Sequence, residues 1–124
     1  MSAPHAEPIV WIIDSEHWPR AGLRAELIER GCEAIGFTAI VEAVITLQFL
    51  AGPKPHVIVL ELREQDLGRE LLSALAGTGI PIVVLGGAME LNEPVIREFD
   101  WAAVIKRPFT LGAVTDKVIE LARR

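Results

Sequence analysis

The stretch "IVWIIDSE", residues 9–16, decides the fold. Its apolar run, Ile9 to Ile13, is stopped at once by Asp14. Short runs of this kind are typical of strands that are buried on both faces of a parallel sheet. Three similar runs follow along the chain, each stopped by a charged residue or a glycine, at 57–60, 82–85 and 102–105. A weaker run at 32–37 completes a set of five predicted strands.

Helical patterns separate these runs. The spacing of apolar residues predicts helices over 21–30, 38–51, 66–76, 91–99 and 110–124. Strands that alternate with helices imply βαβ units and a parallel sheet. We therefore predict a loose tail at residues 1–8 and one α/β domain at 9–124. The domain is expected to be flavodoxin-like and doubly wound, with five parallel strands in the order 2-1-3-4-5 and five helices.

Composition narrows the classes of protein that fit. A chain of 124 residues with 51% hydrophobic content is long enough for one buried core. Its net charge of −5 argues against binding to nucleic acid or to an anionic membrane surface. No apolar run approaches the ~20 residues of a membrane span, and no secretory signal pattern is present. We therefore expect a cytoplasmic protein.

Charged residues and glycines follow the predicted strands. In a doubly wound sheet, the residues after the strands meet where the strand order reverses. We expect this edge to gather two acids, two glycines and a strong cation, with their neighbours: Asp14, Ser15, Glu61, Gly86, Gly87, Arg107 and Pro108. Such a set is typical of a site for a charged group.

Four segments together resemble the receiver domain of two-component response regulators. They are "IVWIIDSE", "PHVIVLEL", "IPIVVLGGA" and "AAVIKRPFT", in the family's order and spacing, and the resemblance covers about residues 8–124. It implies a phosphorylation pocket with an acidic pair that helps bind Mg²⁺, a phospho-accepting Asp, a Thr or Ser, and a Lys before proline. It also implies a cis Arg107–Pro108 bond and, as partner, a histidine kinase or an effector domain.

The chain departs from this pattern at the positions that carry the chemistry. Ser15 replaces the second acid and Glu61 replaces the phospho-accepting Asp, while Gly86 and Arg107 replace the hydroxyl and the Lys. Because Mg²⁺ prefers carboxylate oxygens, we expect its binding to be weak or absent, with Asp14 and Glu61 as weak metal candidates. The longer Glu61 places its carboxylate where the phosphoryl group would lie, and an error of about 1 Å can cost a hundredfold in rate. A contact between the planar Arg107 fork and Glu61 is predicted instead.

These departures predict a degenerate pseudo-receiver, a non-enzymatic signalling module that acts through protein–protein contacts. No dinucleotide-binding, Walker or nucleophile-elbow motif is present. The partner-binding candidates are Met89, Val104 and Phe109 by family analogy, and Val41, Ile45 and Phe49 on an unusually apolar helix, where a homodimer is also possible. Two alternatives stay open: a response regulator that is phosphorylated at a non-standard carboxylate such as Asp14, and a small-ligand or nucleotide sensor with Arg107 as its anion handle.

Overall fold

A parallel sheet in the order β2-β1-β3-β4-β5 forms the centre of the computed structural model, which describes residues 7–124. The strand order is the predicted one. The strands are β1 (Ile9–Ile13), β2 (Glu33–Phe37), β3 (Val57–Glu61), β4 (Ile82–Gly86) and β5 (Ala103–Lys106). Every residue of β1, β3 and β4 is buried, which explains why these strands appear as uninterrupted apolar runs. Residues 1–6 of the predicted tail lie outside the described residues.

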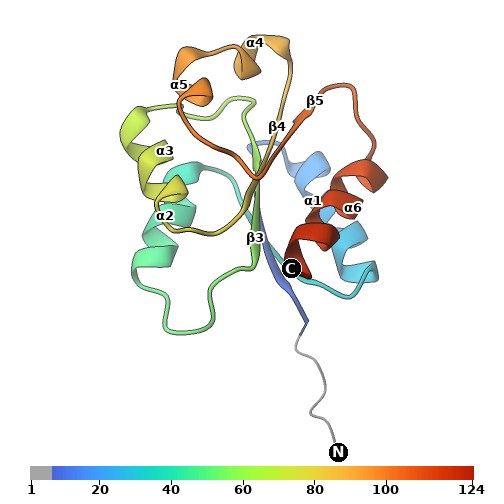
Figure 1. Ribbon diagram of the computed structural model, residues 1–124. Coiled ribbons are helices and arrows are strands. Elements are labelled where there is room, and N and C mark those ends of the chain that lie inside the picture. The colour runs from blue at the N-terminus through green and yellow to red at the C-terminus, as the bar shows by residue number, and fades with distance from the viewer. Residues whose placement is uncertain (1–6) are drawn as a thin grey trace, which may run out of the picture.

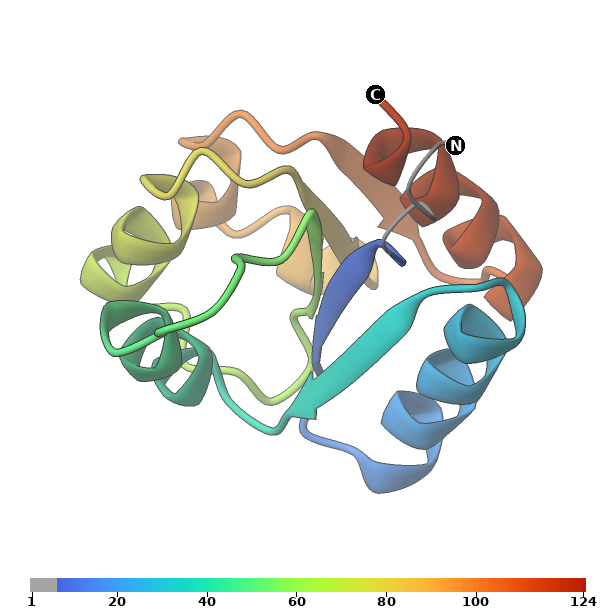
Figure 2. The same ribbon diagram turned by 90° about the horizontal axis from the view of Figure 1, so that it is seen from below.

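Helices cover both faces of the sheet (Figure 1). The helices α1 (His17–Glu29) and α6 (Leu111–Ala122) lie on one face, and α2 (Ile40–Gln48) and α3 (Arg69–Ala76) lie on the other (Figure 2). Two apolar layers result, and β1 contributes to both. Val10 and Ile12 pack toward α1 and α6, whereas Trp11 and Ile13 pack toward α2 and α3. No helix among residues 7–124 is long and apolar enough to span a membrane.

The predicted helix at 91–99 is wrong in its extent. Two short helices replace it, α4 (Ala88–Leu91) and α5 (Pro94–Arg97), so the described residues form six helices rather than five. Pro94 is the first residue of α5. Proline suits a first turn because it has no N–H to donate, but inside a longer helix its ring would collide with the preceding turn. The helix therefore starts anew at Pro94.

The second predicted helix is shorter than 38–51. Ala39 is the residue that precedes α2, and the Glu42 carboxylate accepts hydrogen bonds from the backbone N–H groups of Ala39, at 2.9 Å, and Thr38, at 3.0 Å. This satisfies N–H groups at the helix start that have no partner within the helix. The start of α2 is thus fixed by Glu42 and lies two residues after the predicted one.

Candidate functional site

The carboxyl ends of the strands meet at one edge of the sheet, as predicted. Asp14 follows β1, Glu61 and Gly86 end β3 and β4, and Arg107 follows β5. Asp14 and Glu61 are buried, with 5% and 2% of their surfaces exposed. A buried carboxylate is costly unless it is paired or hydrogen-bonded. The partners of these two acids therefore decide what the site can do.

Glu61 is paired with Arg107 through two parallel hydrogen bonds. Arg107 Nη1 donates to Glu61 Oε1 at 2.6 Å, and Nη2 donates to Oε2 at 2.9 Å. The Arg107 backbone N–H donates to the Gly86 carbonyl at 2.8 Å, and its guanidinium lies 5.4 Å from the centroid of the Phe109 ring. The hydrogen bond to Glu61 raises the pKa of Arg107, against the effect of burial. The predicted contact is confirmed, and its geometry is the strong bidentate one.

Arg63 is a second cation in the site, and the sequence analysis did not identify it. Its backbone N–H donates to Glu61 Oε2 at 3.1 Å. Its guanidinium forms ion pairs with Asp14 Oδ1 at 3.4 Å and, through Nε, with Glu16 Oε1 at 3.1 Å. The sequence shows only that Arg63 stands two residues after the end of β3, which does not say where its side chain lies. We call Asp14, Glu61, Arg63 and Arg107 the charged pocket.

Asp14 is held less tightly than Glu61. Its Oδ1 accepts a hydrogen bond from the Glu16 N–H at 2.9 Å, and Arg20 Nη1 donates to its backbone carbonyl at 2.7 Å. Burial raises the pKa of Asp14, and the Glu16 N–H and Arg63 only partly oppose this effect. The charge of Glu61 also acts to raise this pKa. Desolvation therefore affects the pKa of Asp14 more than its hydrogen bond to Glu16 and its pairing with Arg63 do.

The neighbouring residues leave little room for receiver chemistry. The Ser15 hydroxyl donates to the Arg63 carbonyl at 3.2 Å. A Cβ atom at Gly86 would lie 3.3 Å from Leu91 Cγ and 3.4 Å from Leu62 Cδ1. A hydroxyl-bearing side chain at Gly86 would therefore require Leu91 to move.

The remaining predicted site residues lie at the rim of the charged pocket. The Gly87 N–H donates to Glu90 Oε1 at 3.4 Å, and this carboxylate oxygen lies 3.8 Å from Arg107 Nη2. Pro108 is exposed and follows a cis Arg107–Pro108 bond, as the resemblance implied. Glu90 thus adds a second, looser carboxylate beside Arg107.

Comparison with solved structures identifies the fold of this chain. The described structure superposes on a response regulator receiver protein from Pseudomonas putida with a TM-score of 0.77, at 20% identity over 94% of this chain and 99% of that chain. A receiver protein from Burkholderia phymatum gives 0.75 at 20% identity, covering 94% and 96%. A Francisella response regulator receiver domain gives 0.74 at 18% identity, covering 95% and 98%. The chain has the receiver-domain fold.

Sequence comparisons add no family assignment to this fold. No family model matches the sequence, and no curated protein matches it. At the identities found, the similarity to receiver domains establishes the fold alone.

The receiver fold implies a Mg²⁺ ion beside the phospho-accepting carboxylate, and the residues of this chain do not fit one. Both Glu61 oxygens accept hydrogen bonds from Arg107, and one also accepts from the Arg63 N–H. The Arg63 guanidinium lies against Asp14. Hard cations need several accessible oxygen ligands, and here arginine N–H groups bind both Glu61 oxygens and Asp14 Oδ1. Within residues 7–124, no group of three or more His, Cys, Asp or Glu side chains is placed to hold a metal ion.

The partner-binding candidates lie on two separate surfaces. Met89 of α4 and Val104 of β5 are exposed near the β5 edge of the sheet. Val41, Ile45 and Phe49 are exposed along and just beyond α2. Phe109 differs from the other candidates, because it is half-buried, packs against the layer under α1 and α6, and faces Arg107. Its ring supports the charged pocket and is a poor anchor for a partner.

Proposed function

We propose that this chain is a signalling module with a receiver fold that acts through protein–protein contacts and accepts no phosphoryl group. One observation carries the proposal: the carboxylate at the phospho-accepting position is paired on both oxygens with Arg107. We propose that it is not an enzyme and needs no metal ion.

The chemistry of acyl phosphate formation supports this proposal. A carboxylate oxygen would have to attack the phosphorus of the donor, and the bond from phosphorus to its leaving group would have to break. The attacking oxygen of Glu61 would first lose hydrogen bonds to arginine in a buried site. Separating such a pair leaves an uncompensated carboxylate, which costs about 2–4 kcal/mol at an edge that water can reach. That cost comes before any chemical step and would add to its barrier.

The position of Arg63 also supports the proposal, because its guanidinium group provides positive charge beside Asp14. In receiver domains, as the resemblance implies, a divalent cation neutralises the charge that gathers around the phosphoryl group. Here two arginines already balance Asp14 and Glu61 within the charged pocket. The two arginines thus match the charges of Asp14 and Glu61, while Glu16 and Glu90 contact the same arginines from the rim.

The partner that fits this proposal is a protein of a two-component pathway, either a histidine kinase or an effector domain. The known receiver structures of the same fold belong to response regulators. Met89 and Val104 provide an exposed apolar surface near β5, the region that the resemblance implies for such contacts.

Phosphorylation can be tested on the intact protein. We would incubate the chain with acetyl phosphate and Mg²⁺ and record its intact mass, beside a receiver domain that carries the phospho-accepting Asp as positive control. No adduct of about 80 Da, one phosphoryl group, is expected on this chain. A stable adduct that maps to Glu61 or Asp14, and that Glu61→Gln or Asp14→Asn abolishes, would contradict the proposal.

A further inference from the structure

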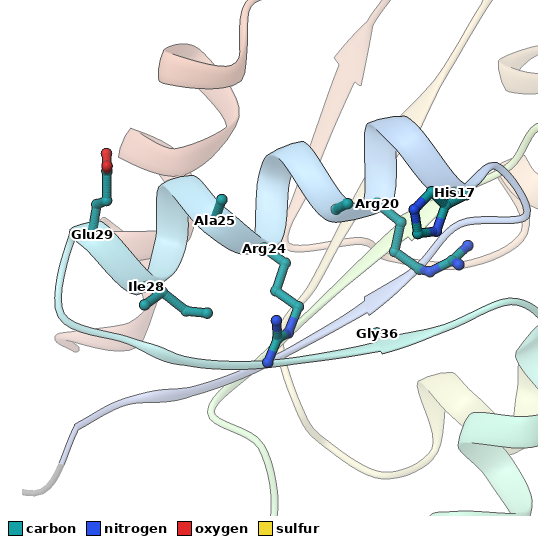
Figure 3. A pocket seen from close by; sticks show the side chains of 8 residues that line it. His17, Arg20, Arg24, Ala25, Ile28, Glu29 and Gly36 are labelled. Atoms are coloured by element: carbon teal, nitrogen blue, oxygen red, sulfur yellow. The ribbon is translucent and has the colours of Figure 1, made fainter.

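A second cation-rich hollow lies between α1 and the edge strand β2 (Figure 3). Its volume is about 420 Å³. His17, Arg20 and Arg24 line it from α1, and Gly36 lies opposite on β2. Ala21, Ala25 and Ile28 add an apolar wall, and Glu29 lines the far end of the hollow. None of these residues was among the predicted site residues.

The two arginines are held in place by backbone groups rather than by acids. Arg20 Nη1 donates to the Asp14 carbonyl at 2.7 Å, and Arg24 Nε donates to the Ala34 carbonyl at 2.8 Å. Within residues 7–124, neither guanidinium forms an ion pair with a carboxylate. Figure 3 shows the Glu29 carboxylate at the far end of α1, turned away from both. Each guanidinium therefore keeps its full charge and several N–H donors for a ligand.

Gly36 fixes the position of Arg20. A Cβ atom at Gly36 would lie 3.0 Å from Arg20 Cδ and 3.2 Å from Arg20 Cγ. The absence of a side chain lets the Arg20 stem pack closely across β2. Arginines that are already ordered lose less conformational freedom when a ligand binds. The arginine side chains of the hollow are thus already ordered before an anion binds.

We propose that this hollow binds a small molecule that carries a diphosphate group. Two guanidinium forks from one face of α1 match the several oxygens and the multiple charges of a diphosphate. The apolar wall fits an organic body attached to it. The net charge of −5 means that attraction is local to the hollow and does not extend to a long polyanion such as nucleic acid. This inference does not depend on the absence of phosphorylation at the charged pocket.

Titration with pyrophosphate, followed by ¹H–¹⁵N NMR, tests the proposal. We expect saturable shifts at Arg20, Arg24 and Gly36, and binding about tenfold weaker in Arg24→Gln. Arg24→Lys should recover part of the affinity, because it restores the charge without the fork. Arg97→Gln, at an exposed arginine of α5 away from the hollow, should bind as the wild type does.

Two results would overturn the proposal. One is the absence of saturable shifts at the hollow in the wild type. The other is an equal loss of affinity in Arg24→Gln and Arg97→Gln, which would indicate general attraction to surface charge. Because Arg24 is exposed, its variants are expected to fold, and a thermal melt of each variant checks this.

Discussion

Glu61 is a carboxylate that the fold removes almost entirely from water, and its charge is balanced chiefly by one side chain. The Arg107 side chain is 33% exposed, whereas the Glu61 side chain is 3% exposed. The two partners are therefore unequal. Removing Arg107 would leave a buried anion, whereas neutralising Glu61 would leave a cation that can turn toward water.

This asymmetry predicts the effect of Arg107→Ala. We expect the free energy of unfolding to fall by about 2–4 kcal/mol, less than for a fully buried pair because water can reach this edge. Arg69→Ala, which removes the exposed pair with Glu98, serves as the matched control and should cost less than about 1 kcal/mol. Urea titration measures both.

A second substitution makes the cause specific. Glu61→Gln in the Arg107→Ala background should recover part of the lost stability, because the buried group is then neutral. Equal stabilities of Arg107→Ala and the wild type would show that the pair contributes nothing. Failure of Glu61→Gln to recover stability would show that the loss comes from packing.

Asp14 predicts a dependence on pH. Burial raises its pKa, so the folded state binds the Asp14 proton more tightly than the unfolded state does. An Asp side chain in the unfolded state ionises at about pH 4. As the pH rises above this value, the wild type therefore loses stability through Asp14, until the pH exceeds the pKa of Asp14 in the folded state. Asp14→Asn titrates in neither state. Its stability relative to the wild type should therefore rise as the pH rises from about 4 toward about 7.

Urea titrations of both proteins across this pH range measure the difference. The opposite result, in which the stability of the wild type rises relative to that of Asp14→Asn as the pH rises, would contradict this prediction. It would mean that pairing with Arg63 affects the pKa of Asp14 more than burial does. The site would then hold Asp14 as firmly as it holds Glu61.

Residue-level prediction succeeded for one cation of the charged pocket and failed for the other. Glu61 ends the buried strand β3 and Arg107 directly follows β5, so the sheet alone brings them together. Arg63 stands in a loop whose path no periodicity describes. Glu64, next to it, has a positive φ of 57°. A turn of that kind redirects side chains, which is why the place of Arg63 became clear only in the structure.

At the scale of the elements, the strands were predicted well and the helix ends were not. Five apolar runs fixed five strands to within a residue or two, because both faces of the central strands are buried. Helix ends depend on local hydrogen bonds. Glu42 sets the start of α2, and Pro94 starts a new short helix, α5, inside the predicted fourth helix. The spacing of apolar residues carries no information about these local interactions, so it does not predict where a helix begins or ends.

The start of α6 offers a direct test of such a local interaction. Thr110 Oγ1 accepts a hydrogen bond from the Ala113 N–H at 3.1 Å. Thr110→Ala should lower the free energy of unfolding by about 1 kcal/mol, because that N–H loses its partner. Thr46→Ala is the matched control, since the Thr46 hydroxyl donates to the Glu42 carbonyl inside α2 and caps no helix. A loss of equal size in both variants would contradict a capping role for Thr110.

At the scale of the whole molecule, the sheet order explains where the charge gathers. The reversal between β1 and β3 places Asp14 beside Glu61, and β4 and β5 extend the same edge to Arg107. The arginines then fall into distinct sets. Arg63 and Arg107 are committed to carboxylates, whereas Arg20 and Arg24 are anchored by backbone carbonyls beside β2.

A ¹H–¹⁵N NMR titration of the wild type with Mg²⁺ and acetyl phosphate tests the central claim most directly. We expect no saturable shift at Asp14, Glu61, Arg63 or Val104, because arginine N–H groups already bind both oxygens of Glu61 and one of Asp14. The same titration of Arg63→Ala is the matched comparison, and Mg²⁺ should shift its pocket signals once Asp14 is uncovered. Saturable shifts in the wild type that run from Glu61 to Val104 would contradict the account, since they would show a pocket that still takes a cation and a phosphoryl group.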